Sequence, residues 1–226
     1  MPNEIVRREP VWSGRLRVLH WTLALTTLLL LASGWILSAD YTPLMANLRS
    51  LHISAGILLS LALAARLALL VWGHAAEHAR DFRTTLRAML DTLRFYITAG
   101  RAPAAAYYAH NPLWAPLYLL LFAALALQAV SGLTWSYGGT ADPEYTLALP
   151  WLLGWTLPEW HHAGYRVIGV FTLAHVLAVG WHDWKGTGAE ISAMFNGHKI
   201  FIIRRASDVL PVAWKKTPGP TNTRDD

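Results

Sequence analysis

The residues best suited to chemistry in this chain are histidines that lie in or beside long apolar stretches. They are His20, His52, the adjacent pair His161 and His162, and His175. An ionisable side chain inside an apolar helix is costly, so it indicates a functional site by default. The chain has no cysteine, which excludes disulfides, thiolate zinc sites, cysteine-held iron–sulfur clusters and thioether-attached haem.

The spacing of the last three histidines selects one of the adjacent pair. His161 and His175 are fourteen residues apart. At about 100° per residue this separation is about 40° short of four turns, so both lie on one helix face, about 21 Å apart along the axis. His162 is about 140° from His175 around the same helix. We therefore expect His161, and not His162, to act on the same side of the helix as His175.

The fourteen-residue spacing recurs in two other apolar stretches. It joins His20 to Gly34 and His52 to Arg66. A glycine at such a position leaves room for a flat ligand to approach the backbone. The spacing therefore predicts two layers of functional side chains, each crossing several helices.

Four apolar stretches are long enough to position these residues across a bilayer, which takes about 20 helical residues. They cover about 18–39, 51–73, 113–135 and 160–181. The chain is 54% hydrophobic and only 15% charged, and it contains 12 tryptophans, a residue that gathers at membrane interfaces. The sequence predicts an all-α integral membrane protein with a single four-helix domain over 1–205 and a polar tail over 206–226.

The connections between the stretches set the orientation. Basic residues gather before the first stretch, between the second and third, and after the fourth, whereas the two other connections hold only Arg49. The positive-inside rule therefore places both termini in the cytoplasm. His20 and His175 then share an inner depth, and His52 shares an outer depth with His161 or His162.

Two facing imidazoles at each depth are typical of b-type haem. Di-iron bundles need glutamate ligands, which the stretches lack, and zinc needs three or four ligands at one depth. Taken singly, His20 and His52 near helix ends are better explained as interfacial or hydrogen-bonded residues, and only the deeper His175 favours a ligand. The pairing by depth and face favours two haems. The candidate arginines for a haem propionate or a quinone are Arg17, Arg66 and Arg166.

Two connecting segments have apolar patterns of their own. In "RDFRTTLRAMLDTLRFYITAG" the apolar residues repeat at helical spacing with arginines on the other face. This pattern predicts an amphipathic cytoplasmic helix, either on the inner membrane surface or as a cap on the bundle. The outer segment 145–160, "YTLALPWLLGWTLPEW", is apolar but short and broken by Pro150 and Pro158, and we interpret it as an interfacial or partner-docking surface.

Several motifs together resemble the bacterial dihaem cytochrome b subunits. The motifs are "LHW", "LHISAG", "HNP", "WHHAGYRVIGVFTLAHV" and "GTGAEISAMFNGHK", and the resemblance covers about residues 14–200. The family includes the cytochrome b of membrane-bound nickel–iron hydrogenase, the formate dehydrogenase gamma subunit and thiosulfate reductase cytochrome b. The resemblance implies two haems b in the bacterial inner membrane, with the axial ligands His20, His52, His161 and His175.

The resemblance also implies partners for the chain. An extracytoplasmic iron–sulfur subunit of hydrogenase or dehydrogenase type, or a c-type cytochrome, would exchange electrons at the outer side, and a quinone would react near His175. The expected function is an electron-transfer subunit between that partner and the quinone pool. The alternatives are a self-sufficient cytochrome b that oxidises a small molecule such as superoxide, and a haem-free anchor or transporter.

Overall fold

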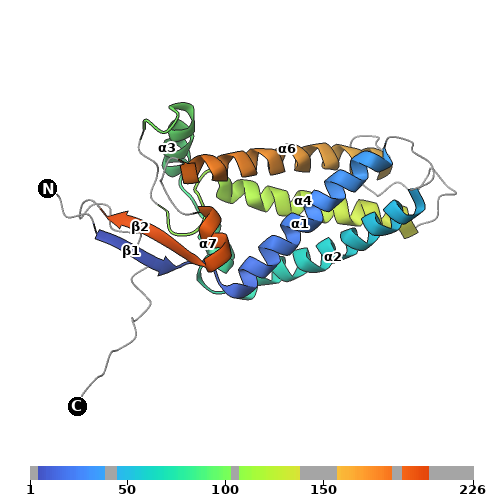
Figure 1. The fold of residues 1–226 in the computed structure, drawn as a ribbon, viewed down its shortest axis with the longest axis horizontal. Helices are drawn as coiled ribbons and strands as arrows, with labels where there is room; N and C mark the ends of the chain where they lie inside the picture. The colour runs from blue at the N-terminus through green and yellow to red at the C-terminus, as the bar shows by residue number, and fades with distance from the viewer. Residues whose placement is uncertain (1–4, 39–44, 103–106, 138–156, 185–189, 204–226) are drawn as a thin grey trace, which may run out of the picture.

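Four long helices form an elongated bundle in the computed structural model (Figure 1). They are α1 (Gly14–Leu37), α2 (Met45–Trp72), α4 (Trp114–Tyr137) and α6 (Leu157–Trp184). The structure describes residues 5–38, 45–102, 107–137, 157–184 and 190–203. Helix α1 packs mainly against α2, α4 against α6, and α2 against α4. Each helix is long and apolar enough to cross a membrane, in agreement with the four predicted spans.

The helices are longer than the apolar stretches that predicted them. Helix α1 begins at Gly14 rather than near residue 18, and α2 begins at Met45 rather than near residue 51. The side chain of Ser13 caps α1 by accepting a 3.1 Å hydrogen bond from the backbone N–H of Leu16. Backbone hydrogen bonding thus continues into polar residues that a hydropathy pattern does not count.

A two-stranded antiparallel sheet, absent from the all-α prediction, lies at one end of the bundle (Figure 1). Strand β1 (Ile5–Pro10) pairs with β2 (His198–Ile203), so that Ile5 lies opposite Ile203 and Pro10 opposite His198. The two strands come from opposite ends of the chain and are not joined by a short turn. No local hairpin pattern could therefore have predicted them.

This end of the bundle, called the sheet end below, also carries the short elements of the fold. They are η1 (Ala75–Glu77), η2 (Ala79–Phe82), α3 (Leu86–Ile97) and α7 (Glu190–Asn196). A small apolar cluster holds η1 and α7 to the start of α1, and its buried members are Val11, Trp12, Leu16, Ala76, Ala109 and Ala193. The opposite end is called the open end. Residues 145–156 of the predicted docking segment lie outside the described part of the chain, as does the predicted tail 206–226.

Helix α3 confirms the amphipathic helix predicted between the second and third spans. The side chain of Thr85 accepts a 3.2 Å hydrogen bond from the N–H of Ala88 and caps its start. Ala99 and Gly100, both with positive φ angles of 53° and 78°, end it in the left-handed conformation typical of helix C-termini. The helix is therefore defined at both ends by local signals.

Candidate functional site

Two layers of side chains cross the bundle, and on every long helix they are fourteen residues apart. The open-end level consists of Gly34, His52, Gly132 and His161. The sheet-end level consists of His20, Arg66, Tyr118 and His175. The sequence had shown this spacing in three of the four apolar stretches. The structure adds the remaining stretch, where Tyr118 and Gly132 of α4 keep the same spacing.

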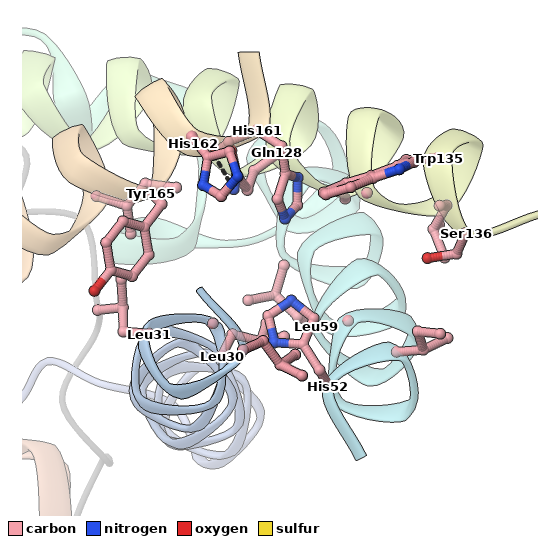
Figure 2. A pocket seen from close by; sticks show the side chains of 18 of the residues that line it. Leu30, Leu31, His52, Leu59, Gln128, Trp135, Ser136, His161, His162 and Tyr165 are labelled. Carbon is pink, nitrogen blue, oxygen red and sulfur yellow. Dashed lines mark hydrogen bonds between the residues drawn. The ribbon is translucent and has the colours of Figure 1, made fainter. Parts of the chain in front are cut away.

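At the open-end level two histidine rings face each other (Figure 2). The ring centres of His52 on α2 and His161 on α6 are 6.3 Å apart, with an angle of 68° between their planes. A bond of about 2.0 Å from a central metal to each imidazole nitrogen separates two facing rings by roughly 6 Å, centre to centre. The distance between His52 and His161 thus fits a pair of axial ligands.

A serine orients each of these two rings. The Nδ1 atom of His52 lies 2.7 Å from the hydroxyl oxygen of Ser33, and that hydroxyl donates to the carbonyl of Leu29. The Nδ1 atom of His161 lies 3.1 Å from the hydroxyl of Ser131, which donates to the carbonyl of Gln128. With each hydroxyl donating to its own helix carbonyl, the serine oxygen can accept a proton from Nδ1, and that tautomer would leave Nε2 with a lone pair for a metal.

The histidines line a cavity of about 520 Å³, a volume within the usual range of ligand pockets. All four long helices contribute to its mainly apolar wall. Two glycines keep the wall open: a Cβ atom on Gly132 would lie 2.7 Å from Cε1 of His161, and one on Gly34 would lie 3.4 Å from Cε1 of His52. A flat ligand could therefore lie against α1 and α4.

The polar residues around this cavity differ in part from those predicted. His162 contributes to the wall but is exposed, whereas His161 faces His52. Arg166 is exposed and does not line the cavity. Arg49, for which the sequence predicted no ligand contact, does line it. Arg49 is thus the cation best placed for a ligand carboxylate.

The second facing pair lies at the sheet-end level. The ring centres of His20 on α1 and His175 on α6 are 6.5 Å apart, with an interplanar angle of 65°. The hydroxyl of Tyr118 lies 3.1 Å from Nδ1 of His175, and the ring of Phe171 stacks on the same imidazole at 6.2 Å and 14°. The distance between His20 and His175 again fits two axial ligands.

Arg66, predicted to face this level, is buried there, with 5% of its surface exposed. Its guanidinium donates a 3.1 Å hydrogen bond to the carbonyl oxygen of Glu77 and lies 5.5 Å and 5.3 Å from the ring centres of Phe82 and Phe122. The aromatic faces stabilise the buried cation. The structure thus brings Arg66 to the sheet-end level as a positive charge with an aromatic surrounding.

The carboxylate of Glu77 joins the start of α1 to the end of α2. It accepts hydrogen bonds from Ser13 at 2.5 Å, from two nitrogens of Arg15 at 2.7 Å and 2.6 Å, and from the N–H of His74 at 3.0 Å. The Arg15 contact is the main reason why the pKa of Glu77 falls from its ordinary value of 4.5 to about 2. Arg15 is therefore engaged by Glu77.

The Arg17 side chain contacts helix α7. Its guanidinium donates to the carbonyl of Phe195 in the last turn of α7, where a positive charge offsets the negative end of the helix dipole. The structure therefore gives Arg17 a contact that holds α7 to α1.

Buried hydrogen-bonded groups surround the sheet-end level, and the sequence analysis did not predict them. Tyr96 of α3 accepts from the indole N–H of Trp114 at 3.0 Å, and its hydroxyl lies 2.7 Å from His182. His110 contacts the carboxylate of Asp81 at 2.5 Å. Burial lowers the pKa of His110, while Asp81 acts in the opposite direction. The open-end cavity, in contrast, is mainly apolar.

An apolar layer separates the two levels. Its buried members are Leu23, Leu59, Ala62, Leu63, Leu125 and Ile168. Among the described residues, no three histidine or carboxylate side chains converge to form a metal site. The donor set of each level is thus a pair of imidazoles, which suits a cofactor that supplies its remaining metal ligands itself.

Comparison with known proteins decides which cofactor this is. A family model described as prokaryotic cytochrome b561 matches residues 11–197. The chain belongs to this family. The cytochrome therefore binds b-type haem in a multi-pass membrane domain and serves membrane electron transport, and the predicted resemblance to hydrogenase cytochromes b is confirmed.

The cytochrome is also similar to several curated proteins over most of its length. It is 24% identical to the probable Ni/Fe-hydrogenase B-type cytochrome subunit of Cupriavidus necator, covering 87% of this chain and 88% of that protein. It is 27% identical to the subunit so named in Rhizobium leguminosarum bv. viciae, covering 84% and 88%. It is 21% identical to the probable Ni/Fe-hydrogenase 1 B-type cytochrome subunit of Escherichia coli K12, covering 84% and 89%. No solved structure matches the chain significantly.

Proposed function

We propose that this cytochrome holds two haems b and relays electrons between a redox partner at its open end and the quinone pool at its sheet end. The observation that carries the proposal is the presence of two facing histidine pairs. Both have a separation that suits axial ligation, and they lie fourteen residues apart along α6. This separation is about 21 Å along the helix axis.

In this proposal His52 and His161 would hold the haem at the open-end level, and His20 and His175 would hold the haem at the sheet-end level. Bound haem supplies reversible one-electron chemistry at each level. The chain's own residues fix the ligands: Ser33, Ser131 and Tyr118 orient three of the four rings. The apolar layer between the levels excludes water from the space that separates them.

The charges favour one orientation in the membrane. The sheet end carries Arg15 in the first turn of α1 and the basic residues that follow α2, among them Arg80, Arg83, Arg87 and Arg94. The positive-inside rule then places the sheet end in the cytoplasm and the open end outside. A bacterial inner membrane has this arrangement, and we place the chain there.

The names of the similar proteins indicate the class of redox partner. Three similar proteins are named as probable B-type cytochrome subunits of Ni/Fe-hydrogenases. We infer that an iron–sulfur subunit of a hydrogenase or related dehydrogenase, or else a c-type cytochrome, docks at the open end. This chain has no cysteine for a cluster of its own, so such a donor is a separate chain.

The quinone is proposed to react beside His175. Arg66 supplies a buried positive charge at that level, and Tyr118 supplies a hydroxyl. Arg15, another basic residue of this end, is bound to Glu77. Arg66 is therefore the cation that best supports the site.

The proposal is tested on the chain purified with its native associates. We expect a haem-to-chain ratio of two in a pyridine haemochrome assay, a co-purifying iron–sulfur enzyme, and reduction of the b bands by added quinol. A spectrum without b bands would contradict the family function. Rapid superoxide-dependent quinone reduction by the isolated chain would instead establish a self-sufficient enzyme.

A further inference from the structure

One face of α3 exposes a continuous apolar stripe, here called the α3 stripe. It consists of Leu86, Leu90, Leu93 and Ile97, whose exposed fractions are 71%, 54%, 40% and 75%. The four side chains lie within an arc of about 60° on the helix. Single exposed leucines are ordinary, but a contiguous exposed row of them indicates a contact surface.

The stripe is not what holds α3 to the bundle. The buried side chains of this helix are Thr92 and Phe95, on the face opposite the stripe. The ring of Phe95 stacks on His182 of α6 at 5.1 Å. Because α3 is attached through this other face, the stripe is turned away from the protein, and a cap that buries its apolar side on the bundle is excluded.

The contacts of α3 place it at the level where the long helices end. Tyr96 receives the indole hydrogen bond of Trp114, the first residue of α4. His182, which stacks on Phe95, lies in the last turn of α6. The exposed indoles of Trp72 and Trp184 mark the same level, and tryptophan is typical of the membrane interface. Figure 1 shows α3 at this end, standing across the direction of the bundle.

Basic side chains flank the α3 stripe. Arg87 and Arg94 are exposed and lie about 80–100° around the helix from Leu86. The exposed Arg83 and Arg101 lie just before and just after the helix, and Asp91 is the acidic residue of α3. This arrangement fits the surface of a membrane, where the apolar row would meet the acyl chains and the arginines would meet anionic headgroups.

We propose that α3 is an interfacial anchor whose stripe inserts among the lipid chains of the inner leaflet, while Arg87 and Arg94 bind the phosphates of anionic lipids. The occupant of the stripe is thus lipid. This inference does not rest on the number of haems or on the identity of the electron partner.

The absence of cysteine from the chain makes a site-specific test possible. Single variants Leu90→Cys and Ile97→Cys carry an environment-sensitive fluorophore on the stripe, and Asp91→Cys carries it on a neighbouring exposed position. Each is reconstituted as the full chain in phosphatidylcholine–phosphatidylglycerol nanodiscs. We expect a blue-shifted emission that is quenched by lipids bearing a nitroxide on the acyl chain at positions 90 and 97, and neither effect at 91.

A second comparison tests the arginines. The Arg87→Gln/Arg94→Gln pair, made in the Ile97→Cys background, should lose most of the increase in lipid quenching that phosphatidylglycerol causes over phosphatidylcholine alone. Equal quenching in both lipids with and without the arginines would overturn the anionic-lipid assignment. Water-exposed labels at 90 and 97 that become shielded only when a partner protein is bound would overturn the membrane anchor in favour of a protein contact. The Soret spectrum of each variant, unchanged from the parent, reports that the bundle is folded.

Discussion

The open-end and sheet-end levels are built on the same four helices with the same spacing, yet they differ in the size and polarity of their residues. On α1 and α4 the open-end level has Gly34 and Gly132. At the sheet-end level α2 and α4 instead present the large side chains of Arg66 and Tyr118. The first level has a cavity with a mainly apolar wall, and the second is surrounded by aromatic rings and buried hydrogen bonds.

This difference indicates a division of roles. An apolar cavity that glycines keep open suits a site that only holds a cofactor and passes an electron. A level with a buried guanidinium, a tyrosine hydroxyl and nearby ionisable groups suits chemistry in which charge and protons also move. Helical spacing therefore sets where the two levels lie, and side-chain size and polarity decide what each can do.

The largest effect should come from removing one imidazole at the open end. His161→Ala deletes a ligand that faces His52, so we expect one haem to be lost and one retained. His162→Ala should retain both, because His162 is exposed and does not face His52. Pyridine haemochrome stoichiometry measures the outcome. Haem loss from His162→Ala with none from His161→Ala would reverse the assignment.

Filling the open-end cavity should be nearly as damaging. In Gly132→Ala the new methyl group would lie 2.7 Å from Cε1 of His161, so the ring must move. We expect weak or absent haem at this level alone, seen as loss of about half of the b-band absorbance. Gly180→Ala on α6 is the matched control, because its methyl group would meet nothing within 4 Å. Equal losses from both variants would show a general packing defect.

Removing a hydroxyl that orients a histidine should change the haem affinity and midpoint potential of one level only, and by less than removing the histidine. Removing a hydrogen bond to a metal-bound histidine typically weakens binding by about 10–100-fold. Ser131→Ala should therefore shift the midpoint potential and haem affinity of the open-end level, and Tyr118→Phe those of the sheet-end level. Redox titration of the two b components measures this. Identical shifts of both components in either variant would count against separate levels.

The smallest effect concerns the Glu77 contacts at the sheet end. The folded-state pKa of Glu77 lies below its ordinary value of 4.5, at about 2, so its contribution to stability is complete above about pH 5 and is lost as the pH falls toward 2. Glu77→Gln should lower the melting temperature at pH 7, and the gap from the parent should narrow toward pH 3. Thermal unfolding in detergent measures it. A gap that does not depend on pH would show that the charge of Glu77 is not responsible.

Local patterns in the sequence predicted the helices and the histidine pairs, because helical phase depends only on residue spacing. The fourteen-residue rule could also have identified Tyr118 and Gly132, since they keep that spacing in the third span. The Ser-Gly pairs Ser33-Gly34 and Ser131-Gly132 repeat in two spans and are a further local signal. The ligand assignments themselves stay predictions until haem is measured.

Other features depended on contacts between distant segments. The sheet joins the two ends of the chain, and Glu77 receives its hydrogen bonds from Ser13 and Arg15, more than sixty positions away. Neither the strand pairing nor the Glu77 hydrogen bonds leave a periodic pattern within one segment, so a local pattern could not predict them. Arg166 shows the reverse: its place in the apolar stretch suggested a ligand contact, but its side chain is exposed, while Arg49 lines the cavity.

The pairing of β1 with β2 has a consequence for how the protein is made. Because residues 5–10 pair with residues 198–203, the segment between them must cross the membrane an even number of times, and loss of any one span would place the two strands on opposite sides. The first strand also emerges from the ribosome long before its partner. The sheet is therefore completed only after the fourth long helix has been synthesised, and its pairing requires that both strands lie on the same side of the membrane.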